Sequence, residues 1–290
     1  MAALNWVQLA LLPMYVIRHV LMLAMVAAAY VLNLPTDAVT VVSVLVISLA
    51  LTALGQAWVL NRRAASEIGH GPTSSDTRTW LAISLPMLMV GGFYLLLTHT
   101  DILVLQQFRS PDDIAIYYAA SKTIALVSFV YFAVSAAVAH RFTEYHVTGD
   151  RHRLAEFLAD SIRWTFWPSA AATAIILLLG KPLLALFGPL FVQGYQVMLI
   201  LAAGLLARAS IGPVERLLTM LGEQRICAAV YAFAFFVNLA LCIVLIPQFG
   251  IEGAAASTAT ALVAESVLLF FITRSRLKLH AFIWGRPGAQ

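Results

Sequence analysis

The chain has 290 residues, of which 61% are hydrophobic and only 11% are charged, and its formal net charge is +4. Its mean hydropathy is +0.88. A water-soluble domain of this size carries about 25% charged residues, so the composition excludes that class and predicts a polytopic membrane protein. The excess of Lys and Arg then signals orientation in short loops, and we expect no nucleic-acid partner.

Apolar stretches long enough to cross about 30 Å of hydrocarbon recur along the whole chain. They predict an all-α bundle of about eight transmembrane helices, at roughly 6–32, 37–60, 79–108, 113–139, 161–187, 193–221, 225–247 and 252–273. Turn segments such as "FRSPDD" and "IPQFGIEG" separate these spans. The sequence contains no Walker loop, nucleophile elbow or zinc motif, so we expect no enzyme, no metal and no cofactor.

Two longer polar connections, 61–78 and 140–157, and the tail "TRSRLKLH" hold most of the basic residues. The positive-inside rule therefore places both termini and both connections in the cytoplasm. These basic segments could also attract anionic membrane lipids.

Several charged residues stay inside the predicted spans, where an ionisable group costs about 2.5–3.5 kcal/mol on insertion scales. Such residues usually face the bundle interior or a wet cavity and mark a substrate or ion path. The set is Arg18, Asp101, Lys122, Arg208, Glu215, Arg216 and Glu265.

Helical spacing indicates which of these share a face. Arg208, Gly212, Glu215 and Thr219 fall at i, i+4, i+7 and i+11, which makes one stripe. Pro213 follows Gly212 in that stripe, so we expect a kink or an opening there. Two opposite charges beside a kink suit a gated cavity; the alternative is a structural ion pair.

The remaining charges are interpreted in the same way. Lys122 shares a face with Tyr118, so it either looks inward or lies near the outer boundary. Glu265 lies on the small-residue face "GAAASTATA", where it faces the cavity or is sealed into a close helix contact. Asp101 lies on a mixed polar face of a helix that Pro86 makes bendable.

The order of these motifs resembles a known family. "LPMLMVGGFYLLLTHTDILVLQQFRSPDDIAIYYAASKTIAL", "LLALFGPLFVQGYQVMLILAAG" and "VLIPQFGIEGAAASTATAL" resemble the second lobe of Wzx-like polysaccharide flippases, members of the multidrug/oligosaccharidyl-lipid/polysaccharide exporter superfamily. The resemblance spans about 79–275. It implies a six-helix second lobe at 79–275, preceded by two helices at 1–60 that resemble the end of a first lobe, with a linker at 61–78 and a tail at 276–290.

The resemblance implies transport of an undecaprenyl-diphosphate-linked oligosaccharide across the bacterial inner membrane by alternating access, for surface polysaccharide or lipopolysaccharide biosynthesis. Lys122, Arg208, Tyr118 and Arg18 would then bind the substrate. Asp101, Glu215 and Glu265 would bind a coupling ion or hold the basic residues in place, and Gly212, Pro213 and Pro86 would bend their helices.

The chain departs from the family in lacking the first four helices of the two-lobe fold. We therefore expect a truncated product, or a chain that works with the missing first-lobe helices or as a homo-oligomer. Two alternatives stay open: cation-coupled multidrug efflux in the same superfamily, and a non-transporting component of a polysaccharide assembly machine.

Overall fold

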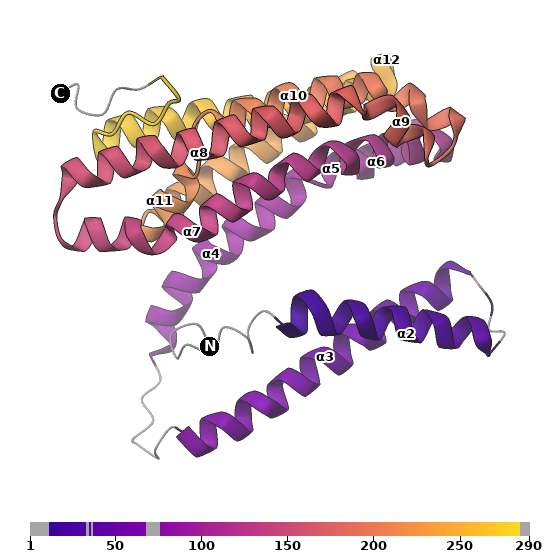
Figure 1. The fold of residues 1–290 in the computed structure, drawn as a ribbon, viewed down its shortest axis with the longest axis horizontal. Coiled ribbons are helices and arrows are strands. Elements are labelled where there is room, and N and C mark those ends of the chain that lie inside the picture. The colour runs from indigo at the N-terminus through magenta and orange to yellow at the C-terminus, as the bar shows by residue number, and fades with distance from the viewer. Residues whose placement is uncertain (1–11, 33–34, 36, 68–75, 285–290) are drawn as a thin grey trace. The chain divides into compact units, whose positions relative to one another are not determined.

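The computed structural model describes residues 12–32, 35, 37–67 and 76–284, and every regular element in these ranges is a helix. The predicted all-α, polytopic membrane fold is thereby confirmed. The chain divides into two compact units, Met1–Ser75 and Asp76–Gln290, and Figure 1 traces the helices of each.

Five helical stretches among the described residues are long and apolar enough to cross a membrane. They are Val39–Arg63, Thr77–Phe108, Pro111–Val147, Pro189–Ala209 and Gln224–Leu277. The last stretch contains two of the predicted spans. The predicted span 161–187 begins within the helix Arg151–Leu178, and Arg18–Val31 is a shorter apolar helix.

The N-terminal unit is a pair of packed helical segments. Its elements are η2 (Pro13–Ile17), α2 (Arg18–Val31) and α3 (Ala38–Glu67). The side chain of Asp37 accepts a hydrogen bond from the amide of Thr40 at 2.8 Å and so caps the start of α3. Because α3 continues to Glu67, part of the expected linker 61–78 is helical; residues 68–75 lie outside the described residues.

The second unit begins with a broken span. Its first elements are α4 (Thr77–Leu97), α5 (Thr100–Phe108) and α6 (Pro111–Ile124). Asp76 caps α4, and hydrogen bonds from the hydroxyl and amide of Thr79 lower the pKa of the Asp76 carboxyl. The helix stays continuous through Pro86 and stops instead at Thr98, whose hydroxyl donates to the carbonyls of Tyr94 and Leu95.

The middle of the second unit continues the bundle without a long loop. Its elements are η3 (Ala125–Val127), α7 (Ser128–Val147), α8 (Arg151–Leu178), α9 (Gly180–Ala185) and η4 (Pro189–Gly194). Asp150 accepts a hydrogen bond from the amide of Arg153 at 3.0 Å and caps α8. Part of the polar connection expected at 140–157 is thus helical, and α7 and α8 pack side by side (Figure 1).

The predicted span 193–221 consists of two helices, α10 (Tyr195–Ala209) and α11 (Val214–Met220). Gly212 adopts a φ of +59°, which favours glycine, and Pro213 precedes the first turn of α11. The prediction that Arg208 and Thr219 lie on one continuous helical face is therefore wrong, because the chain turns between α10, which carries Arg208, and α11, which carries Thr219.

Helix α12 (Gln224–Ile272) consists of two helical halves. They are separated at Gly250, whose backbone angles are not helical. The guanidinium of Arg109 donates hydrogen bonds to the carbonyls of Ile246 and Pro247, each at 3.2 Å. These contacts satisfy carbonyls at the end of the first half. α12 packs against α4, α5 and α10, so it forms the centre of the bundle.

The segment that follows α12 packs back on the bundle. After η5 (Thr273–Leu277), Lys278 turns the chain with a φ of 58°. Leu279, Ala281 and Ile283 are then buried in one apolar cluster with residues of α7, α8 and α11. The first part of the expected tail 276–290 is therefore packed; residues 285–290 lie outside the described residues.

Candidate functional site: a polar cavity in the second unit

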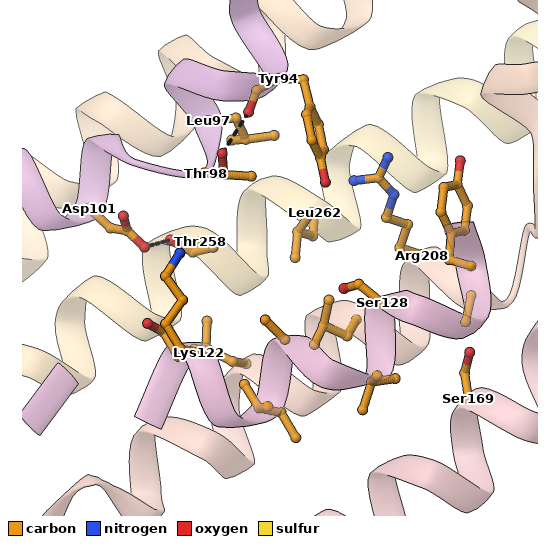
Figure 2. Close-up of a pocket in the computed structure, with 18 of the residues that line it drawn as sticks. Tyr94, Leu97, Thr98, Asp101, Lys122, Ser128, Ser169, Arg208, Thr258 and Leu262 are labelled. Atoms are coloured by element: carbon orange, nitrogen blue, oxygen red, sulfur yellow. Dashed lines mark hydrogen bonds between the residues drawn. The ribbon is translucent and has the colours of Figure 1, made fainter. Parts of the chain in front are cut away.

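The second unit contains a cavity of about 310 Å³ among α4, α5, α6, α7, α8, α10 and α12 (Figure 2). Its walls are mostly apolar, and a few polar groups converge on it, which is the usual composition of a ligand pocket. The described residues with polar or aromatic side chains that line it are Tyr94, Thr98, Asp101, Ser121, Lys122, Ser128, Tyr131, Phe132, Ser169, Arg208 and Thr258.

Arg208 sits at the cavity wall inside a group of tyrosines. Its side chain is about 10% exposed, and its guanidinium carbon lies 5.1 Å from the ring centre of Tyr94, 4.9 Å from that of Tyr131 and 5.9 Å from that of Tyr231. A cation within about 6 Å of an aromatic ring centre is attracted to the ring face. One N–H of Arg208 also donates to the Tyr231 hydroxyl at 2.9 Å. The cluster holds a permanent positive charge at the cavity.

Glu265 contacts the same guanidinium. Its Oε1 lies 3.5 Å from Nη2 of Arg208, and its side chain is fully buried. Among the described residues, neither carboxylate oxygen has a hydrogen-bond partner of standard geometry. Of the two interpretations made from the sequence, the geometry resembles the sealed helix contact, because Glu265 is not among the described lining residues.

Asp101 joins three helices at another part of the wall. Its Oδ2 accepts hydrogen bonds from the Tyr117 hydroxyl of α6 at 2.5 Å and from the Thr258 hydroxyl of α12 at 3.1 Å. Its Oδ1 accepts the amide of Ile102 at 2.8 Å. A carboxylate with these partners is kept buried at a tolerable cost.

Lys122 lines the same cavity as Asp101. Its Nζ lies 5.2 Å from the ring centre of Tyr118, and Figure 2 shows its side chain extending toward the Asp101–Thr258 pair. Tyr118 itself is half exposed and is not among the described lining residues. Lys122 and Arg208 thus bring two positive charges to one space.

The other predicted site residues lie elsewhere. Glu215 is half-buried on α11, where its Oε1 lies 3.4 Å from the Thr219 hydroxyl. Gly212 and Pro213 form the break between α10 and α11, next to the last turn that carries Arg208. Pro86 is inside α4. Arg18 begins α2 in the N-terminal unit, so the cavity of the second unit is described without it.

Sequence reasoning missed the tyrosines around Arg208 and the partner of Asp101 at Tyr117. The sequence does carry a signal for these tyrosines, because a tyrosine buried within an apolar span usually needs a hydrogen-bond partner for its hydroxyl. Tyr117 and Tyr231 are both buried in such spans. Tyr117 meets Asp101 and Tyr231 meets Arg208, and these pairings depend on how different helices pack, which spacing within one helix does not encode.

The arrangement suits binding and movement of a polar group more than covalent chemistry. In the described ranges, no three His, Cys, Asp or Glu side chains come together as metal ligands. The fixed charges instead offer charge-assisted hydrogen bonds in a low-dielectric space. A helical membrane bundle around such a cavity defines a transporter-type membrane protein.

Comparison with known proteins agrees with that class. The MatE family matches residues 86–244, more than half of the chain, and the chain belongs to this family of the multidrug/oligosaccharidyl-lipid/polysaccharide exporter superfamily. A curated relative, the probable low-salt glycan biosynthesis flippase Agl15 of Haloferax volcanii, is 22% identical over 180 residues. The match covers 62% of this chain and 38% of that relative, so the chain spans well under two thirds of the relative's length.

Proposed function

We propose that the protein moves an isoprenoid-diphosphate-linked oligosaccharide, of the undecaprenyl-diphosphate-sugar type, across the inner membrane of a bacterium for surface polysaccharide biosynthesis. Both termini would lie in the cytoplasm, as the positive-inside rule favours. Membership of the MatE family and the similarity to a protein named as a glycan biosynthesis flippase support the proposal. Transport would proceed by alternating access around the cavity.

The observation that carries the proposal is the pair of basic side chains, Lys122 and Arg208, in a cavity whose walls are otherwise largely apolar. A diphosphate offers several anionic oxygens, and charge-assisted hydrogen bonds to guanidinium and ammonium groups are about twice as strong as neutral ones. The apolar walls of the cavity would contact the isoprenoid chain of the substrate. Asp101 would bind a coupling ion or orient Lys122.

A cationic drug is the competing substrate in this superfamily. Aromatic faces are the usual partners of such cations, but here the rings of Tyr94, Tyr131 and Tyr231 already surround the guanidinium of Arg208. A second cation in the same place would be repelled by Arg208. The electrostatics of the cluster therefore favour an anionic substrate.

A complete transport path also needs a wall opposite the second unit. We propose that further helices of the first-lobe type, or a second copy of the chain, supply it. Membrane lipids would meet the outer faces, where large apolar side chains such as Trp164, Trp167 and Phe236 are exposed.

The test uses a strain that lacks the gene and carries variants on a plasmid. Lys122→Ala and Arg208→Ala should each lower export of surface polysaccharide at least tenfold at equal protein abundance. Lys181→Ala is the matched control, because Lys181 is exposed on α9 and is not among the described lining residues. Unchanged export in both cavity variants would remove the proposal and favour a non-transporting role. Drug hypersensitivity of the deletion strain with normal polysaccharide would favour efflux.

A further inference from the structure

Glu265 is a buried carboxylate that faces Arg208 and Tyr231. It is 0% exposed, neither oxygen accepts a hydrogen bond of standard geometry from the residues that the structure describes, and its ion-pair partner among them is Arg208 at 3.5 Å. A buried carboxylate needs pairing and hydrogen bonds to remain charged at low cost. Arg208 supplies the positive charge that favours the ionised form of Glu265.

Arg208 in turn serves two neighbours at once. Its side chain lines the cavity, whereas Glu265 does not. A guanidinium has five N–H donors, and one of them is engaged by the Tyr231 hydroxyl. The remaining donors can be shared between the carboxylate of Glu265 and an anion that enters the cavity. Figure 2 shows the Arg208 side chain among the residues that line it. The 3.5 Å between Nη2 of Arg208 and Oε1 of Glu265 is longer than a charge-assisted hydrogen bond, which is about 2.7–2.9 Å.

We propose that an anionic ligand and the carboxylate of Glu265 compete for the guanidinium of Arg208, and that Glu265 takes up a proton from solvent when the ligand binds. This inference rests on the proposed function, since it concerns the same cavity. Ligand oxygens would accept N–H groups of Arg208, and the carboxylate would become a neutral carboxylic acid. Release of the ligand would return the proton and restore the ion pair. One positive charge would thus link proton uptake to anion binding.

The groups that face the pair determine how specific this link is. Tyr131 of α7 and Tyr231 of α12 contact the guanidinium through their rings, as does Tyr94 of α4. Glu215 of α11 is the other carboxylate that acts electrostatically on Glu265. The Oε1 of Glu215 lies near the Thr219 hydroxyl, whereas Oε1 of Glu265 lies 3.5 Å from the guanidinium that lines the cavity. Glu265 is therefore the residue that we expect to take the proton.

The experiment measures protons directly. Farnesyl diphosphate serves as a soluble isoprenoid diphosphate probe and is titrated by calorimetry into the full chain in detergent, at pH 7, in two buffers of different ionisation enthalpy. The difference in heat gives the number of protons taken up on binding. The wild type should take up about one proton more than Glu265→Gln. Glu215→Gln should match the wild type, and the probe's own titration cancels between variants.

The affinity gives a second readout. As the pH rises by one unit, binding to the wild type should weaken about tenfold more than binding to Glu265→Gln, because the wild type takes up one extra proton on binding. Glu265→Gln leaves Arg208 without its carboxylate, which can impair folding. The charge-neutral Arg208→Gln/Glu265→Gln variant avoids the unpaired charge and should fold but lose probe binding.

The outcomes separate this inference from the proposed function. Equal proton uptake in the wild type and Glu265→Gln, with binding intact, would overturn the exchange and leave the anion site standing. Absence of probe binding to the wild type would overturn both. Should Glu265→Gln not fold, a wild-type proton number that equals the probe's own contribution would overturn the exchange.

Discussion

The side-chain amide of Asn238 donates a hydrogen bond to the main-chain carbonyl of Leu97 at 3.2 Å, across 141 positions of sequence. Leu97 is the last residue of α4, so its carbonyl has no partner one turn later in its own helix. Asn238 is fully buried in the first half of α12. The contact therefore allows α4 to end inside the bundle, directly before the turn that brings Asp101 to the cavity.

Replacing Asn238 with Ala should destabilise the protein, because the buried carbonyl of Leu97 would lose its partner. Interhelical hydrogen bonds in membrane proteins contribute about 0.6 kcal/mol on average and up to about 1.7, and we expect a value in the upper part of that range. The measurement is the free energy of unfolding in detergent. Gln248→Ala, at an exposed position of the same helix, is the control and should change little. Equal stability of the two variants would contradict the role of Asn238.

Replacing Arg109 with Gln should loosen the junction between the halves of α12. The guanidinium donates to the carbonyls of Ile246 and Pro247, and it lies against Gly250, where an added Cβ would be 3.3 Å from the guanidinium carbon. Hydrogen bonds to charged groups contribute about 1.5–3 kcal/mol. We expect a loss of that order in thermal unfolding. Arg225→Gln, an exposed basic residue near the start of α12, should be nearly neutral; a similar loss there would refute the capping role.

Replacing Gly204 with Ala should force α10 away from α12. A Cβ on Gly204 would lie 2.8 Å from Cα of Ala259, a backbone atom that cannot rotate aside. Overpacking of this kind costs roughly 1–3 kcal/mol. Gly92→Ala is the matched control, because a Cβ there meets nothing within 4 Å and Ala favours a helix by about 0.5–1 kcal/mol. The two variants should therefore shift the melting temperature in opposite directions, and a neutral Gly204→Ala would disprove the close contact.

The fold class was predictable because hydropathy reports burial in lipid, and the apolar runs are long. The charged residues within spans were also visible, since ionisable groups are rare there. The break between α10 and α11 lies at the Gly212-Pro213 pair, where the sequence predicted a kink. The break at Thr98 was harder to place, because it depends on a contact with another helix: Asn238 meets the end of α4.

The assembly of the site was predictable only in part. Spacing within one helix can show that Arg208 and Glu265 lie on polar or small faces, but not that α10 and α12 bring them to 3.5 Å. Likewise, nothing local joins Tyr117 to Asp101. Long-range pairings of this kind follow from the packing of several helices, for which a single sequence carries no direct periodic signal.

The segment after α12 should stabilise the break between α10 and α11. The amide of Ile283 donates to the carbonyl of Ser210 at 3.0 Å, and the Ile283 side chain is 7% exposed in the cluster it shares with α11. Ile283→Ala should lower the free energy of unfolding by about 2 kcal/mol or more. Ile283→Pro should lower it further, because it also removes the donor.

Hydrogen exchange distinguishes a local effect from a global one. In both Ile283 variants the amides of Ile211, Gly212 and Val214 should exchange faster than in the wild type, whereas those of α5 should not change. Trp284→Ala is the control, since its side chain is 80% exposed, and it should leave exchange and stability nearly unaltered. Unchanged exchange near Ser210 in Ile283→Pro would show that the segment does not support the break. Faster exchange there would mean that residues after α12 help to set the position of the turn that follows Arg208.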